Sequence, residues 1–160
     1  MDERKARDLA GEWHALHGGG ETPPFYEHLV HALGGLLPDE LAATGAVSGD
    51  EGPMIVALSD RRIFAAKPRE ATGEPGVELN VVTIEVAQAQ IAVTEHLVKA
   101  PRVTRKRRWS FSALDVDIVF TTEQSLRTAF SSERQDDNDE LLARAISGAL
   151  GWAMPWSQEK

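Results

Sequence analysis

The sequence predicts a single α+β domain, in which two N-terminal helices precede about seven short antiparallel strands and one closing helix. Three observations predict this fold class. Apolar residues recur at helical spacing in the first 40 residues, the apolar period changes to two from Leu41 onward, and helical spacing returns over residues 137–154. At 160 residues the chain fits one ordinary domain with a real core. We divide it into a helical pair (1–40), a strand-rich domain with its C-terminal helix (41–153) and a tail (154–160).

Two apolar stripes and their stop signals define the helical pair. The first stripe consists of Ala6, Leu9, Ala10, Trp13 and Leu16, and the glycines at residues 18–20 end its helix. The second helix follows Pro24, which suits a first helical turn, and it ends at Pro38. Its stripe consists of Tyr26, Leu29, Val30, Leu33, Leu36 and Leu37. Each stripe needs a surface to cover it, which can be the other helix, the following domain or a second subunit.

The strands are predicted by short alternating or β-branched segments that are separated by turn signals. They cover residues 41–47, 54–59, 61–67, 77–86, 90–99, 115–122 and 126–132. Residues 103–113 can form either a further strand or a protruding loop, and both interpretations stay open. The closing helix begins with acidic residues, where the helix dipole favours negative charge. Its apolar face consists of Leu141, Leu142, Ala145, Ile146, Ala149 and Leu150.

A resemblance to a known family rests on two segments. Residues 55–66, "IVALSDRRIFAA", resemble a hairpin of small bacterial pleckstrin-homology-like (PH-like) domains of the YokE type. Residues 81–96, "VVTIEVAQAQIAVTEH", are similar to the segment that follows there, with Ile84 and Ile91 at its apolar positions. The resemblance covers about residues 41–150. It implies an antiparallel PH-like β-barrel closed by a C-terminal helix, here preceded by the helical pair, and a non-catalytic binding role without a particular ligand.

One stretch concentrates positive charge in a chain whose formal net charge is −8: residues 99–111 hold six of the 17 basic residues. If this segment is a strand, alternation places Arg105 and Arg107 on one face and Lys106 and Arg108 on the other. If it is a loop, all of its cations can converge on one anionic partner. Alternatively, the cations are solvated or pair with the acidic residues 133–140. The candidate binding residues are Lys99, Arg102, Arg105, Lys106, Arg107, Arg108 and Trp109.

The sequence predicts no catalytic centre, no cofactor and no metal site. It has no cysteine, which excludes disulfides and thiolate ligands. Two H-x-x-H pairs have a spacing that can chelate zinc, but the helical wheel places the second pair on the solvent side, so we expect surface histidines. These histidines are His14, His17, His28 and His31. Asp115 and Asp117 have strand spacing, and we expect them to belong to a polar strand face rather than to an acid–base pair.

These observations predict a cytoplasmic, non-catalytic adaptor or scaffold subunit that binds another protein. One alternative is peripheral association with an anionic membrane through residues 99–108. A weaker alternative is an unrecognised enzyme that unites Asp115, Asp117 and His96. The acidic balance argues against nucleic acid, and self-association stays open. We expect a cytoplasmic location because no apolar run approaches the roughly 20 residues that span a bilayer and none resembles a secretory signal.

Overall fold

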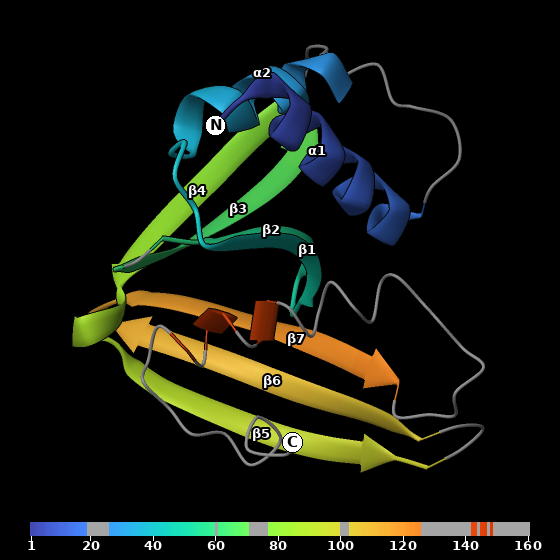
Figure 1. The fold of residues 1–160 in the computed structure, drawn as a ribbon, viewed down its shortest axis with the longest axis vertical. Coiled ribbons are helices and arrows are strands. Elements are labelled where there is room, and N and C mark those ends of the chain that lie inside the picture. The colour runs from blue at the N-terminus through green and yellow to red at the C-terminus, as the bar shows by residue number, and fades with distance from the viewer. Residues whose placement is uncertain are drawn as a thin grey trace.

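The computed structural model describes residues 1–18, 26–59, 61–70, 77–99 and 103–125, together with residues 142, 143, 145, 146 and 148. Two helices precede seven antiparallel strands in this part of the chain (Figure 1). The elements are α1 (Glu3–His17), α2 (Tyr26–Leu36), β1 (Ala43–Gly49), β2 (Gly52–Leu58), β3 (Arg62–Glu70), β4 (Val77–Glu85), the short 3₁₀ helix η1 (Val86–Gln88), β5 (Gln90–Val98), β6 (Thr104–Ala113) and β7 (Val116–Ser125).

The helices begin and end where local chemistry favours it. The carboxylate of Asp2 accepts a hydrogen bond from the Lys5 N–H at 2.9 Å and so caps α1. Gly18 follows α1 with a φ of 136°, which glycine adopts without strain, and this confirms the predicted helix stop. Both apolar stripes are confirmed as well, except that Leu36 is 53% exposed. The buried members are Ala6, Leu9, Ala10, Trp13, Leu29, Val30, Leu33 and Leu37.

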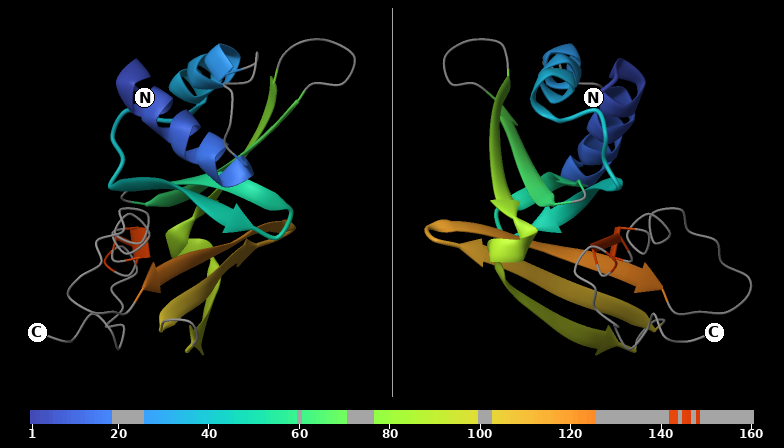
Figure 2. Two further views of the ribbon diagram at one scale, coloured as in Figure 1. Left: turned by 90° about the vertical axis from the view of Figure 1, so that its right-hand side faces the viewer. Right: turned by 60° about the vertical axis from the view of Figure 1, so that its left-hand side comes forward.

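All seven strands belong to one antiparallel sheet in the order β4-β3-β2-β1-β7-β6-β5. The contact between β1 and β7 is short, because only Ser48 with Thr121 and Gly49 with Phe120 are paired. The sheet therefore divides into two halves, β1–β4 and β5–β7, that lie one above the other (Figure 2). The helical pair covers the side of β1–β4 that faces away from β5–β7 (Figure 1).

The closed barrel predicted for the fold class is wrong, because the sheet is open. β4 and β5 are its two ends and do not pair with each other, although only η1 and its flanking residue separate them in the chain. Each of them pairs along its length with one inner strand, β4 with β3 and β5 with β6. Alternation along a strand is the same in open and closed sheets, so the sequence pattern could not reveal this difference.

The predicted C-terminal helix that closes the barrel is also not seen as an element of the described residues. Most of residues 137–154 lie outside the described part of the chain. Five described positions, residues 142, 143, 145, 146 and 148, have helical backbone, and Leu142, Ala143 and Ile146 are buried against the sheet. The strand predicted at residues 126–132 lies outside the described residues too, whereas residues 104–113 form β6.

Two hydrophobic cores share the strand β2. One core lies between the two halves of the sheet, and there Phe120 stacks between Trp109 and Phe111, with ring centroids 6.4 and 6.1 Å away. The other core lies between the helical pair and β1–β3. Successive residues of β2 point alternately into these cores, so that Met54 to Leu58 are all buried. This accounts for the unbroken apolar run that the sequence shows at this strand.

Candidate functional site

The basic segment is a strand, and its side chains divide between two faces of the sheet. Arg105 and Arg107 of β6 share the inner face with Trp109, while Lys106 and Arg108 lie on the outer face. Arg107 is only 2% exposed. The protruding-loop interpretation is therefore wrong for residues 104–113, because alternation prevents these cations from converging on one partner.

An acidic residue of the neighbouring strand holds the two inner arginines. Glu95 of β5 lies directly opposite Arg107. Its Oε1 is 3.2 Å from Nε of Arg105 and 3.3 Å from Nε of Arg107. A buried guanidinium requires such a partner, because removing its charge from water costs several kcal/mol.

The two outer cations are compensated by other strands. Lys106 Nζ lies 3.5 Å from Glu123 Oε1 on β7, and Arg108 donates two hydrogen bonds, of 3.1 and 2.9 Å, to the carboxylate of Asp50 in the β1–β2 turn. Exposed pairs of this kind contribute about 0–1 kcal/mol to stability. They do compensate the positive field of the segment, which weakens the attraction that an anionic lipid surface would feel.

The remaining predicted binding residues have different surroundings. Trp109 is fully buried, and its Nε1–H donates a hydrogen bond of 3.0 Å to Oγ1 of Thr122. Lys99 is exposed, and Arg102 lies outside the described residues. The six of these residues that the structure describes thus do not form one surface, and the role of all seven in binding stays a prediction.

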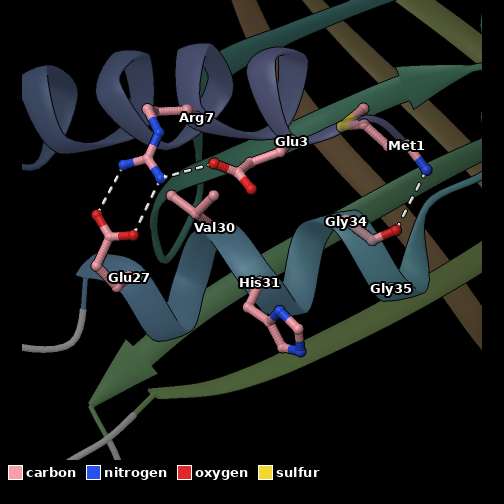
Figure 3. Close-up of a pocket in the computed structure, with 8 residues that line it drawn as sticks. All are labelled: Met1, Glu3, Arg7, Glu27, Val30, His31, Gly34 and Gly35. Carbon is pink, nitrogen blue, oxygen red and sulfur yellow. Dashed lines mark hydrogen bonds and ion pairs between the residues drawn. The ribbon is translucent and has the colours of Figure 1, made fainter.

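A second candidate site is a hollow of about 450 Å³ between α1 and α2 (Figure 3). The walls of this hollow come from α1, from α2 and from Met1 at the amino terminus, and none of the described strands contributes a lining residue. The residues that line it are Met1, Glu3, Arg7, Glu27, Val30, His31, Gly34 and Gly35.

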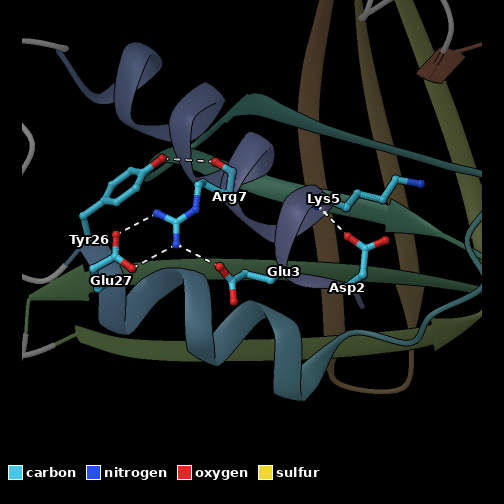
Figure 4. Close-up of polar contacts among 6 residues, drawn as sticks. All are labelled: Asp2, Glu3, Lys5, Arg7, Tyr26 and Glu27. Atoms are coloured by element: carbon cyan, nitrogen blue, oxygen red, sulfur yellow. Dashed lines mark hydrogen bonds and ion pairs between the residues drawn. The ribbon is translucent and has the colours of Figure 1, made fainter.

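An ion-pair network joins the two helices at one end of this hollow (Figure 4). Arg7 of α1 donates hydrogen bonds of 2.7 and 3.0 Å to the two carboxylate oxygens of Glu27 on α2, and a third of 3.2 Å to Glu3. These bonds raise the pKa of Arg7 and lower the pKa of Glu27. Tyr26 adds a hydrogen bond of 3.1 Å from its hydroxyl to the Arg7 carbonyl. Because two carboxylates share one guanidinium, this rim of the hollow has an excess of one negative charge.

The amino terminus forms the other end of the hollow. The ammonium group of Met1 donates hydrogen bonds to the carbonyls of Gly34, at 3.2 Å, and Leu37, at 2.8 Å. It also lies 2.7 Å from Asp39 Oδ1 and thereby lowers the pKa of Asp39. A cation at this position satisfies carbonyls that the end of α2 leaves without helical partners.

The floor of the hollow has no side chain at two positions, Gly34 and Gly35. A Cβ on Gly34 would approach the carbonyl oxygen of Met1 at 3.5 Å, an ordinary contact, and a Cβ on Gly35 would meet nothing within 4 Å. Neither glycine has a positive φ. The packing within the described residues would therefore accept alanine at both positions.

A smaller hollow of about 400 Å³ lies on the opposite side of His31, between α2 and the start of β4. Its lining includes His28, Ala32 and Val77, and it shares Glu27 and His31 with the first hollow. The two hollows thus follow the exposed face of α2, and we call them together the α2 groove. The groove was not predicted from the sequence, although the pair of glycines inside an apolar helical pattern, Gly34 and Gly35, was a signal for it.

The residues proposed for an enzyme are not brought together. Asp117 lines a third hollow, of about 530 Å³, with Lys67 and Asn80 near the β1–β2 turn, but neither His96 nor Asp115 lines it. Asp115 lies in the turn before β7 rather than in the strand. In the described ranges, no group of three or more His, Asp or Glu residues could hold a metal ion.

No protein-family model matches the chain, and no curated protein is significantly similar to it. The resemblance to YokE-type PH-like domains therefore stays a prediction. Neither of the described helices is long and apolar enough to cross a membrane.

Proposed function

We propose that this protein is a non-catalytic binding module, an adaptor or scaffold subunit that holds a segment of a partner protein in the α2 groove. The observation that carries the proposal is the open floor at Gly35. Glycine in the interior of a helix costs about 1 kcal/mol relative to alanine, and less near a helix end such as Gly35, the last residue but one of α2. Among the described residues, neither backbone conformation nor packing requires glycine at this position, so a side chain would mainly remove space from the groove.

The groove also indicates the chemistry of the partner segment. Ala32 and Val77 are partly exposed and offer apolar surface along it, with the buried Val30 beneath. The missing side chains at the floor allow close approach of a partner's backbone or of a small apolar side chain. The rim at Glu3 and Glu27 carries the excess negative charge. A segment that combines small apolar residues with a lysine or arginine fits this surface.

Photocrosslinking tests the proposal directly. A photoreactive amino acid replaces His31 in the groove, and in a control it replaces the exposed Asp8 on α1. In lysate of the native organism, the His31 probe should cross-link one protein repeatedly and the Asp8 probe should not. Combining the His31 probe with Gly35→Leu, which fills the hollow, should abolish the product, whereas combining it with Ala15→Leu on an exposed position should not.

Two results would contradict the proposal. One is a cross-link that forms equally from both probe positions. The other is a specific cross-link from His31 that survives Gly35→Leu in a variant with an unchanged circular dichroism spectrum.

A further inference from the structure

In the described part of the chain, β5 is an end strand of the sheet, and its outer side has no strand paired to it. Nine residues of β5 pair with β6 in an unbroken register, and among the described residues no strand pairs with the other side of β5. The four residues 94–97 are all exposed, and β5 forms the outer end of the lower half of the sheet (Figure 1). Natural edge strands are commonly short or carry proline, lysine or a bulge. β5 has none of these four features, and its one charged residue, Glu95, is engaged by Arg105 and Arg107 of β6.

We propose that the free edge of β5 binds the β5 of a second copy of this chain, antiparallel, about a twofold axis at Thr94. The two sheets then become one continuous sheet across the dimer, in the manner of strand addition. This contact does not use the α2 groove, so either proposal can fail without the other.

The register follows from the side chains. With Thr94 opposite its own copy, Ile91 lies opposite the partner's Leu97, and Val93 lies opposite the partner's Glu95. Threonine pairs and apolar pairs directly across an antiparallel ladder are favourable. Leu97, which is 45% exposed in the single chain, gains an apolar neighbour on the same face. No like charges face each other.

The neighbouring registers that keep the two faces of the sheet aligned are less favourable. A twofold axis at Glu95 places the two Glu95 carboxylates directly opposite each other, which destabilises the ladder. A twofold axis at Val93 places Leu97 opposite Ala89, which precedes the partner strand. The register centred on Thr94 is therefore the one that this strand fits best.

A charge swap at the axis tests the register. Thr94→Glu leaves each copy well paired internally, because the new carboxylate lies opposite Arg108 on β6. Across the axis it opposes its own copy, so the variant should dimerise at least about tenfold more weakly. Thr94→Lys should also dimerise weakly, and an equimolar mixture of the two variants should regain a heterodimer. The matched control is Thr83→Glu on β4, the opposite edge strand, where the same substitution on an exposed threonine should leave association unchanged.

Sedimentation velocity of the full chain over a concentration series, up to about 1 mM, measures these effects. Because each copy carries a formal net charge of −8, wild-type association should strengthen when salt is added. The inference is overturned if wild type is monomeric throughout, if Thr94→Glu dimerises as wild type does, or if mixing the two variants restores nothing. Circular dichroism confirms that each variant is folded, so that a lost dimer reports the edge contact.

Discussion

Replacing both glycines at the floor of the α2 groove with alanine should stabilise the protein. A Cβ on Gly35 enters open space and one on Gly34 makes an ordinary contact at 3.5 Å, so neither substitution creates a clash. The interior of a helix favours alanine over glycine by about 1 kcal/mol, and less at a position as close to the helix end as Gly35. For the double variant Gly34→Ala/Gly35→Ala we expect a gain of about 1–1.5 kcal/mol. In a chain of this length, each kcal/mol raises Tm by about 2–4 °C.

Urea unfolding followed by circular dichroism measures the gain, and Gly18→Ala is the control with the opposite sign. Gly18 has a φ of 136°, a conformation that alanine adopts only with strain, so its substitution should cost about 1 kcal/mol or more. A double variant that is less stable than wild type would refute the reasoning, because some packing constraint would then require the glycines. If the groove binds a partner, the more stable double variant should also cross-link less from position 31.

Three further predictions concern the sheet and its ion pairs. Arg107→Ala removes a guanidinium that is 2% exposed, and it should lower the free energy of unfolding in urea by about 2–3 kcal/mol. Lys106→Ala, at the next position, should change that free energy by less than about 0.5 kcal/mol. Equal costs for the two variants would contradict the assignment of the two faces. Burial raises the pKa of Glu12 above its ordinary value of 4.5, because it disfavours the charged carboxylate. The stability of the folded protein that is linked to the protonated Glu12 is therefore fully present below pH 4.5 and is lost as pH rises through the raised pKa. Glu12→Gln should therefore gain stability relative to wild type as pH rises from about 4.5 to 7, and a constant difference across a pH series of thermal melts would argue against this. Gly49→Ala places a Cβ 2.7 Å from the sulfur of Met54, and the free energy of unfolding should fall by about 1–3 kcal/mol. An unchanged free energy of unfolding would contradict this, because it would mean that the β1–β2 turn or Met54 shifts without cost.

The sequence was informative wherever a local period determines the structure. Helical spacing identified eight residues of the N-terminal helical pair that are buried, whereas Leu16 and Tyr26 are partly buried and Leu36 is exposed. For the case that residues 103–113 form a strand, alternation also assigned Arg105 and Arg107 to one face, and the structure places both on that face. Such predictions succeed because side-chain direction follows directly from backbone geometry.

Prediction failed where distant segments determine the outcome. Whether β4 and β5 pair depends on how the two halves of the sheet diverge away from the short contact of Ser48 and Gly49 with β7, and no local pattern records this. For the basic segment, one alternative was that its cations are solvated or pair with residues 133–140, and this stays a prediction because those residues lie outside the described part of the chain. The partners seen in the described residues, Glu95, Glu123 and Asp50, were not predicted. Cross-strand register selects such partners, and register emerges only from the folded sheet.

The strand β2 has a consequence for how the protein unfolds. Its residues alternate between the core beneath the helices and the core between the sheet halves, so neither core can open without exposing one side of the same strand. The two hydrophobic layers are thereby coupled, and loss of either one removes part of the other's support. The helices α1 and α2 accordingly cover Ile55, Ala57 and Ala66. A chain without them would present an apolar sheet surface to its neighbours in solution, and its fate would be aggregation rather than independent folding.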